Sequence, residues 1–244
     1  MASEPENPTA PSSADTADYT QTPRSQRTAL LVLGFVGVLI LGFAVGVLAR
    51  IPLADNAPSV PGPGSVDVGF SQDMSVHHLQ AVEMSTIAMT NATDPRVRNL
   101  AFDILTAQQN QIGQMQGWLT MWGQPPLPPG EGYMAWMTEG SGGHGHGDQH
   151  GSHSGPANRM PGMATSEEMA ALRQATGEDV DVLFLQLMLR HHEGGMPMME
   201  YGVQYASEQV VRGIAQKMVN TQASESELMT SMLEQRGASP LPMN

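Results

Sequence analysis

The sequence predicts an all-α protein in which a four-helix bundle, made of two repeated helical hairpins, follows one N-terminal transmembrane helix. The first observation is a repeat, because the segment Met74–His78 recurs as Met188–His192 at a distance of 114 residues. Each copy consists of a methionine, two intervening residues and a pair of histidines. The same spacing holds without gaps over some 57 residues, which indicates an internal duplication. The second observation is an uncharged run of 22 residues, from Thr28 to Ala49.

The composition excludes some kinds of site and argues against one class of partner. The 244 residues contain no cysteine, which excludes disulfides and thiolate metal sites. The net charge is −13 and Lys217 is the single lysine, so nucleic-acid binding is not expected. Methionine is abundant, with 19 residues. Such an acidic, methionine-rich chain is compatible with cations as ligands.

The N-terminal region divides into three segments. Residues 1–27 are rich in Pro, Ser, Thr and acidic residues, and we expect them to be a disordered cytoplasmic tail. Residues 28–49 are long enough to cross a bilayer core of ~30 Å as a helical anchor, and residues 50–66 form a Pro/Gly tether. Two arginines precede the apolar run and one follows it, which favours a cytoplasmic N-terminus and an extracytoplasmic C-terminal domain. The alternative is a cleaved signal peptide and a secreted protein, although the run exceeds the ~7–15 residues of a usual signal core.

The bundle is expected to span residues 67–240. In its first hairpin, residues 67–123, a helix leads through a turn into a second helix that runs to about Trp122. Thr93 or Asp94 is the predicted N-cap of this second helix, because the next residue is a proline that suits a first turn.

The second hairpin, residues 178–237, repeats this pattern. Its first helix is predicted over 179–206, with a kink at Pro197, because proline removes a backbone hydrogen bond. Ser207 is the predicted cap of its second helix, which ends at Gly237.

The two hairpins are joined by a connector, residues 124–164, that we expect to be flexible. It is rich in Pro, Gly, His and Met, and its imidazoles could collect metal, although a solvated linker is the alternative. Thr165 and Glu168 then match a capping box that opens a short helix. The candidate ligands in the connector are His144, His146, His150 and His153.

The paired histidines are the central candidate site. Since each residue advances ~100° around a helix, His77 and His78 fall on either side of a stripe centred on Met74, and the second copy repeats this around Met188. Small residues on both stripes would let the two helices approach closely. If the repeats pack about a pseudo-twofold axis, both histidine pairs converge at one interface. The predicted metal ligands are His77, His78, His191 and His192, with Met74 and Met188 assisting.

Further residues could support this site. Methionines at helical spacing are usually core residues, and acidic residues beside the histidines either orient an imidazole or face solvent. Equivalent glutamines in the two halves could hydrogen-bond the histidines across each hairpin. These weaker candidates are Met84, Met198, Glu83, Glu193, Gln108 and Gln222.

Imidazole and thioether ligands without thiolate point to copper. Thioether sulfur favours Cu(I), while imidazole suits copper, zinc, iron and nickel, so zinc or iron are the alternatives. A di-iron bundle instead needs Glu-x-x-His motifs on inward faces. No glutamate lies three positions before any of the four paired histidines, so oxidase chemistry of that type is not favoured.

Three segments resemble a known bacterial family, the "domain of unknown function 305". They read DMSVHHLQAVEM, FLQLMLRHHEGGMPMM and TAQQNQIGQMQGWL, and the resemblance extends over about residues 68–240. It implies a ferritin-like four-helix bundle, an extracytoplasmic protein and a role in copper binding, but no established reaction. Glu225 lies where the family has a carboxylate, and Gln111 replaces it in the first half.

The sequence therefore predicts a membrane-anchored, extracytoplasmic protein that sequesters or transfers copper in copper homeostasis or tolerance. The alternatives are a ferritin-like metal oxidase and a structural or interaction module whose histidines only pack. The non-enzymatic function is the better supported one. A homodimer is compatible with the sequence, and the sequence identifies no delivery partner.

Overall fold

The structure is a computed structural model that describes residues 24–54, 60–130, 132–137 and 157–244. The described residues contain six helices and no strand beyond one isolated bridge, which confirms the all-α prediction. The chain divides into two units, residues 1–59 and residues 60–244, which we describe separately. The four histidines predicted for the connector and the N-terminal tail up to residue 23 lie outside the described residues.

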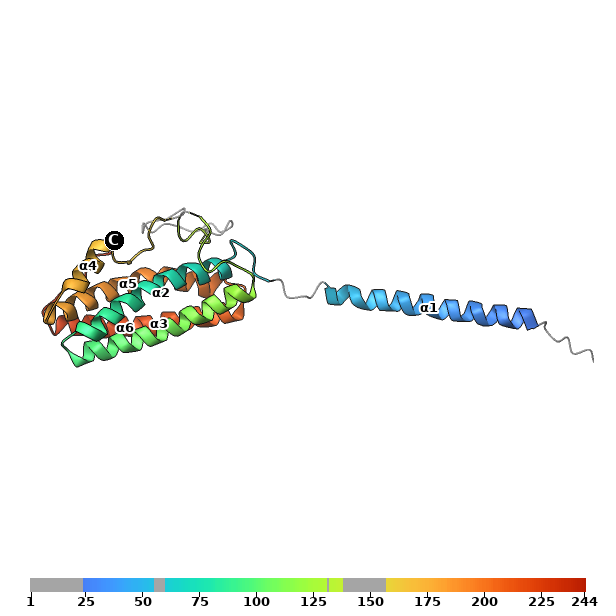
Figure 1. Cartoon of the computed structure of the whole chain (residues 1–244), viewed down its shortest axis with the longest axis horizontal. Coiled ribbons are helices and arrows are strands. Elements are labelled where there is room, and N and C mark those ends of the chain that lie inside the picture. Colours follow the sequence, from blue (N-terminus) through green and yellow to red (C-terminus); the bar gives the residue numbers. More distant parts are fainter. Residues whose placement is uncertain (1–23, 55–59, 131, 138–156) are drawn as a thin grey trace, which may run out of the picture. The chain divides into compact units, whose positions relative to one another are not determined.

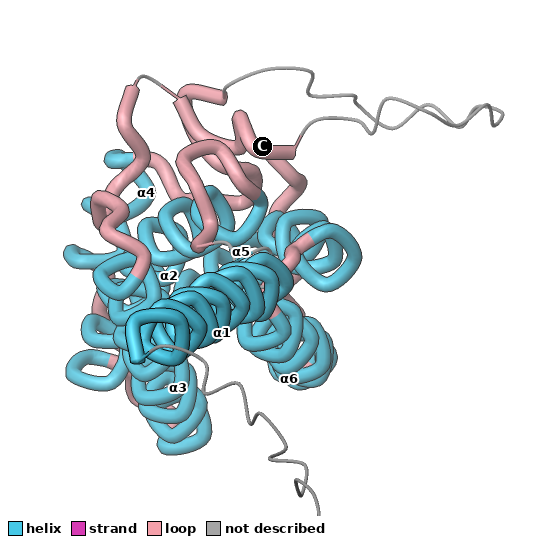
Figure 2. Tube along the Cα trace, turned by 90° about the vertical axis from the view of Figure 1, so that its right-hand side faces the viewer, coloured by secondary structure: helices cyan, strands magenta, loops and turns pink. Residues whose placement is uncertain are grey.

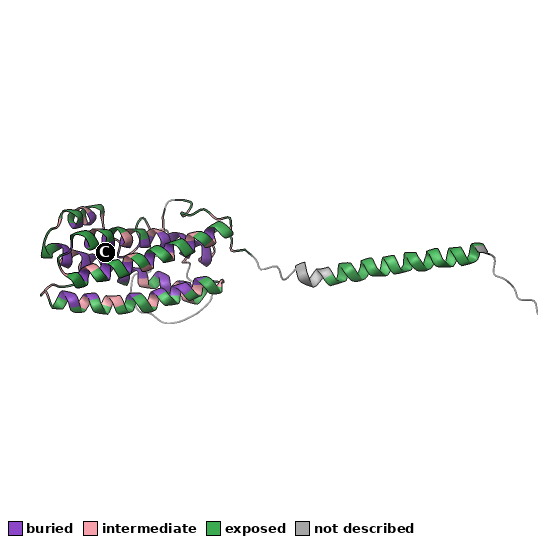
Figure 3. Cartoon of the chain, turned by 60° about the horizontal axis from the view of Figure 1, so that its bottom comes forward, coloured by how far each residue is buried: buried purple, intermediate pink, exposed green. Residues whose placement is uncertain are grey.

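The first unit contains one helix, α1 (Arg24–Ala54), which begins earlier and ends later than the predicted anchor. Within it, Ser25–Ala49 is long enough to cross a membrane, and its most apolar stretch has a mean hydropathy of 2.8. The side chains of residues 25–49 are exposed within the unit (Figure 3). This helix fits either a membrane anchor or a signal sequence.

The second unit is a bundle of four long helices with a short fifth helix beside it (Figure 1). α2 packs on α3, α5 packs on α6, and the two hairpins meet where α2 packs on α5. The connecting loops lie over α2 and α5, whereas α3 and α6 lie on the other side of the bundle (Figure 2). The helices are α2 (Val66–Asn91), α3 (Pro95–Met121), α4 (Ser166–Gln174), α5 (Glu178–Tyr205) and α6 (Gln209–Glu234).

The two hairpins cap each other reciprocally. Asp181, in the first turn of α5, accepts hydrogen bonds from the backbone N–H groups of Thr93 and Asp94 at the start of α3. Its repeat equivalent, Asp67, accepts them from Ser207 and Glu208 at the start of α6. The predicted cap by the Ser207 side chain is therefore wrong, because a buried carboxylate of the other hairpin binds these donors.

Other predicted helix ends agree with the structure. Asp94 is the N-cap of α3, with a proline in the first turn. Thr165 and Glu168 form the predicted capping box of α4. α5 continues through Pro197 to Tyr205, and the kink at this proline stays a prediction.

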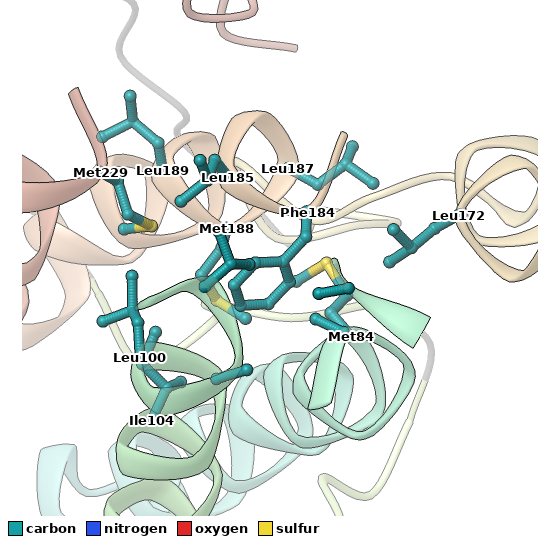
Figure 4. Packing of buried hydrophobic residues seen from close by; sticks show 14 of the residues in the cluster. Met84, Leu100, Ile104, Leu172, Phe184, Leu185, Leu187, Met188, Leu189 and Met229 are labelled. Carbon is teal, nitrogen blue, oxygen red and sulfur yellow. The ribbon is translucent and has the colours of Figure 1, made fainter. Parts of the chain in front are cut away.

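The core consists of two hydrophobic clusters, one at each end of the bundle, and both draw on all four long helices. Figure 4 shows the first cluster, where Phe184 and Met188 of α5 lie close to Met84 of α2 and Ile104 of α3. The second cluster holds Phe70, Met74, Met115, Met198, Met199, Ile214 and Met218, with the loop residues Trp136 and Met160.

Both described ends of the connector are bound to the bundle, so the expectation of a flexible connector is wrong for residues 132–137 and 157–164. Backbone hydrogen bonds of 2.8 and 2.9 Å join Tyr133 to Ala157. The buried carboxylate of Asp73 accepts hydrogen bonds from the Met134 N–H and from the Trp136 indole. These are contacts between residues far apart in the sequence, which loop composition does not reveal.

Candidate metal centre

The four paired histidines lie midway along α2 and α5, between the two hydrophobic clusters. All four have 0% exposure. Along α3 and α6, the buried Gln108 and Gln222 also fall between residues of the two clusters. These six side chains form a polar layer between the two hydrophobic clusters, and the structure thus brings both histidine pairs to one level of the bundle.

His77 and His191 meet at the contact between α2 and α5. Their ring centroids are 3.7 Å apart and the ring planes are inclined by 31°, so the imidazoles stack face to face. His191 Nε2 also lies 3.0 Å from the His77 carbonyl oxygen, to which it donates a hydrogen bond. The predicted convergence of the two pairs at one interface is present in the structure.

His78 and His192 instead bond to the outer helices. His78 Nε2 lies 2.7 Å from Gln111 Oε1 of α3, and His192 Nε2 lies 2.7 Å from Glu225 Oε2 of α6. Gln111 and Glu225 are equivalent positions of the repeat, so one half of the layer has an amide where the other has a carboxylate. Sequence reasoning noted these two positions only through the family resemblance.

Burial keeps the imidazoles of His77, His78 and His191 neutral. It lowers the pKa of His77 to about 3, and repulsion from His78 and His192 adds to this effect. Burial also lowers the pKa of His78 to about 3 and holds the pKa of His191 well below its usual range. Nδ1 of His78, His191 and His192 has no hydrogen-bond partner among the described residues, whereas a contact between the His77 ring and the Pro161 backbone partly offsets the lowering of the His77 pKa. Neutral rings with unpaired nitrogens are the form of histidine that binds metals.

The predicted methionine ligands are buried on either side of the layer. Met74 packs in the second hydrophobic cluster and Met188 in the first, each with 0% exposure. Met84 packs in the first cluster and Met198 in the second. All four therefore contribute to the core, and ligation by any of them stays a prediction.

Of the two possibilities that the sequence leaves for the acidic residues, the structure has them facing solvent: Glu83 is exposed and pairs with Arg173, and Glu193 is exposed on α5. Gln108 is buried without any hydrogen bond, because the amide that reaches His78 is Gln111, one helical turn further along. For Gln222, the side-chain oxygen likewise has no partner among the described residues.

Glycines let the backbones approach the histidines. A Cβ atom on Gly195 would lie 2.9 Å from His77 Cε1, which confirms that a small residue is needed on this stripe. A Cβ on Gly194 would lie 2.4 Å from the Pro161 carbonyl oxygen and 2.5 Å from Gly162. Gly162 itself has φ +77° and lies against the backbone of His191, so the end of the connector covers α5 directly above the stacked rings.

As they stand, no three His, Cys, Asp or Glu side chains among the described residues are grouped closely enough to hold a metal ion. Stacked rings direct their nitrogen lone pairs within the ring planes rather than toward each other. An ion shared by His77 and His191 would thus require the two rings to turn.

Comparison with known proteins identifies relatives over the bundle. Residues 67–233 match the family described as a domain of unknown function, DUF305. A DUF305 protein from Streptomyces coelicolor has a similar structure, with a TM-score of 0.63 and 41% identity over 73% of this chain and 98% of that one. A DUF305 fragment from Deinococcus radiodurans gives a TM-score of 0.56 and 30% identity over 72% and 99% of the two chains.

Two more distant similarities were found. CopM in the Cu(I)-bound form has a TM-score of 0.50 and 20% identity over 69% of this chain and 96% of that one, which shows a shared fold. The uncharacterized protein L153 of Acanthamoeba polyphaga mimivirus is 39% identical over 49 residues, and this match spans 20% of the chain and 32% of that relative's length.

Proposed function

The chain belongs to the DUF305 family, and we propose that it is a membrane-anchored, extracytoplasmic protein that binds copper in its bundle and either sequesters the ion or passes it on. The proposal combines the apolar helix α1 with the buried histidine layer. The bundle supplies the site, and α1 would hold it at the outer face of a membrane.

One observation carries the proposal: two histidine pairs from duplicated helices converge in a buried layer with unpaired ring nitrogens. Leaving a buried polar atom without a partner costs about 1–3 kcal/mol, and Nδ1 of His78, His191 and His192 is such an atom. A merely structural histidine layer would be expected to satisfy these atoms. A bound cation would satisfy them.

Copper is the metal that the ligand chemistry favours. Neutral imidazole nitrogens are present at the layer, thioether sulfurs flank it, and the chain has no thiol. Thioethers select Cu(I), and imidazoles bind both Cu(I) and Cu(II). The Cu(I)-bound form of CopM, which shares the fold, supports the same assignment for this chain. Zinc or iron at the same histidines would be the alternative result.

Ferritin-like oxidase chemistry is less well supported. Such sites use several inward carboxylates as ligands, whereas Glu225 is the one carboxylate that hydrogen-bonds any of these histidines among the described residues. The donor set is thus rich in nitrogen and sulfur, which suits binding and transfer of a soft ion.

The test is an anaerobic Cu(I) competition titration of the full chain in neutral detergent. We expect stoichiometric binding that is lost when His77, His78, His191 and His192 are all replaced by Ala. The matched control replaces the four connector histidines, His144, His146, His150 and His153, and should retain the bundle site. Circular dichroism verifies that each variant is folded. Unchanged Cu(I) binding in the folded bundle variant, or preferred binding of zinc or iron, would overturn the proposal.

A further inference from the structure

An ion bound among four histidines with 0% exposure needs a path to them. On the side of α2 and α5, the connector blocks this path. Gly162 lies against His191 and Gly194, and the Gln80 side chain holds the next turn through hydrogen bonds of 2.7 and 2.9 Å to the Ala164 backbone. Met160 is fully buried in the same segment. An ion therefore does not reach the layer from this side while the segment is bound.

On the other side of the bundle, a shallow cleft of about 410 Å³ lies open to solvent between α3 and α6. Figure 2 shows these two helices on the side of the bundle away from the connecting loops. Asp103 of α3 and Thr221, Ser224 and Glu225 of α6 are among its lining residues. The side chain of Glu225 keeps 15% exposure, and its carboxylate contacts His192, which is fully buried. Glu225 thus links the cleft to the histidine layer.

The charge of this cleft differs from that of the repeat-equivalent surface. The position equivalent to Asp103 in the other half is Lys217, the only lysine of the chain, and the position equivalent to Glu225 is Gln111. The cleft is therefore lined by two carboxylates, whereas the corresponding surface of the other half carries a cation and an amide. Immediately after a duplication the two halves would carry the same charges on these surfaces. They now differ at the cleft, where an incoming ion would first contact the bundle.

From these observations we infer that the cleft between α3 and α6 is the entrance through which cations reach the histidine layer. Asp103 attracts the ion at the rim and Glu225 is the first ligand below it, from which the ion passes to the His192 imidazole, whose Nε2 faces this carboxylate. Carboxylate oxygen and imidazole nitrogen are both ligands of divalent copper. The inference rests on the proposed function. It adds the side of the bundle from which the ion enters, which the positions of the histidines do not reveal.

The experiment measures the rate of loading separately from the amount of metal bound. Full-length protein in neutral detergent is mixed with Cu²⁺, weakly buffered by glycine, and quenching of tryptophan fluorescence is followed by stopped flow. All variants are made in a background without His144, His146, His150 and His153, so that only the bundle contributes. Equilibrium dialysis gives the number of ions bound at the end.

A steric pair of variants tests the position of the entrance. Ser224→Trp places a large side chain in the cleft, and Asn110→Trp places it at the repeat-equivalent exposed position outside it. We expect Ser224→Trp to slow association by about tenfold and Asn110→Trp to stay within twofold of the parent. Equal slowing by both variants, or by neither, would overturn the inference.

A charge pair tests the role of Asp103. Electrostatic steering changes association rates by about 10–10³-fold, so Asp103→Lys should load about tenfold more slowly at low salt, and the difference should shrink as salt is raised. Glu200→Lys makes the same change in net charge at an exposed site on α5 and should stay within twofold. If both variants bound the normal number of ions at the same rate, the cleft would not be the entrance, but the proposed function would stand. Absence of Cu²⁺ from the histidines of the parent would also refute the entrance, and only the further absence of Cu(I) in the competition titration would refute the proposed function as well.

Discussion

At the residue scale, burial determines the charge of His77, His78 and His191, because it lowers the pKa of each of these imidazoles. A protonated imidazole in the layer would face other imidazoles within a few ångströms and would have no water to solvate it. The ring centroids of His77 and His78 are 6.4 Å apart, and those of His77 and His191 are 3.7 Å apart. Neutral rings avoid both penalties, and they also leave nitrogen lone pairs available for a metal.

This arrangement predicts that the apo bundle loses stability in mild acid. The pKa of His77 and of His78 is about 3 in the folded state and near 6.5 in the unfolded state. Between these values only the unfolded chain binds the proton, so the free energy of unfolding falls as pH decreases below 6.5. Each of these histidines should cost about 2 kcal/mol at pH 5 relative to pH 7. Urea titrations of metal-free protein, followed by tryptophan fluorescence, measure this slope.

The control for the pH prediction is a variant with His77→Gln and His78→Gln. It lacks the two titrating groups, so its stability should depend less steeply on pH between 7 and 5 than that of the parent. Equal slopes for the two proteins would show that other groups cause the acid sensitivity.

The positions of the histidines could be predicted from the sequence, but their partners could not. Helical periodicity placed both pairs beside one stripe, because that argument needs only the ~100° step between residues. Gln108 and Gln111 lie one turn apart on α3, and the tilt of the helix decides which one reaches His78. That tilt depends on the packing of all four helices, which no local pattern contains.

At the element scale, the reciprocal caps connect the two hairpins. Asp67 and Asp181 are each almost fully buried, and each accepts hydrogen bonds at the N-terminus of a helix in the other hairpin. Asp181 additionally accepts a hydrogen bond from the Thr93 hydroxyl at 2.6 Å. These carboxylates therefore stabilise both a helix end and the contact between the repeats.

Removing either cap should destabilise the bundle, because it leaves partly buried backbone N–H groups without their hydrogen-bond acceptor. We expect Asp67→Ala to lower the free energy of unfolding by about 1–2 kcal/mol and Asp181→Ala by about 2–3 kcal/mol, since Asp181 has the additional partner. The control is Asp179→Ala, at an exposed site in the first turn of α5, which should cost at most about 0.5 kcal/mol. Urea denaturation compares the three. A loss at Asp67 or Asp181 no larger than at Asp179 would contradict the capping role.

The caps also show why some helix ends were predicted and others were not. Asp94 and the pair of Thr165 with Glu168 are local signals, within three residues of the groups that they satisfy. The start of α6 is capped from Asp67, and the connector is bound by Asp73, both far away in the sequence. Ser207 and a Pro/Gly-rich loop were the local signals available there, and tertiary contacts overrode them.

At the scale of the whole molecule, the duplication produces a bundle with near twofold symmetry whose two halves differ in function-bearing details. The cores at the two ends use equivalent residues, such as Phe70 with Phe184 and Met74 with Met188. The connector lies on one side only, and the carboxylate beside the histidines belongs to one half only. The features that both repeats share could be predicted from the sequence repeat. The features that only one repeat has depend on which side chains lie next to each other in the folded bundle.

The topology of the full chain is the last prediction. The chain has no cysteine, so single cysteines introduced as Ser12→Cys, before α1, and Ala223→Cys, at an exposed site on α6, are clean labels. With α1 as a retained anchor and a cytoplasmic N-terminus, a membrane-impermeant maleimide should label Ala223→Cys on intact cells and Ser12→Cys only after lysis. Ala101→Cys, at a buried site in α3, should stay unlabelled until the protein is denatured.

The same labels distinguish the alternatives, because each predicts a different pattern. Cleavage of α1 as a signal sequence would remove Ser12→Cys from the mature protein and release labelled Ala223→Cys into the medium. Labelling of Ser12→Cys on intact cells, with Ala223→Cys protected, would place the bundle in the cytoplasm. A reducing, thiol-rich cytoplasm already holds Cu(I) on thiolates, so that outcome would remove the reason for a thiol-free copper site. The retained-anchor pattern would instead place the histidine layer where a cysteine-free site is resistant to oxidation.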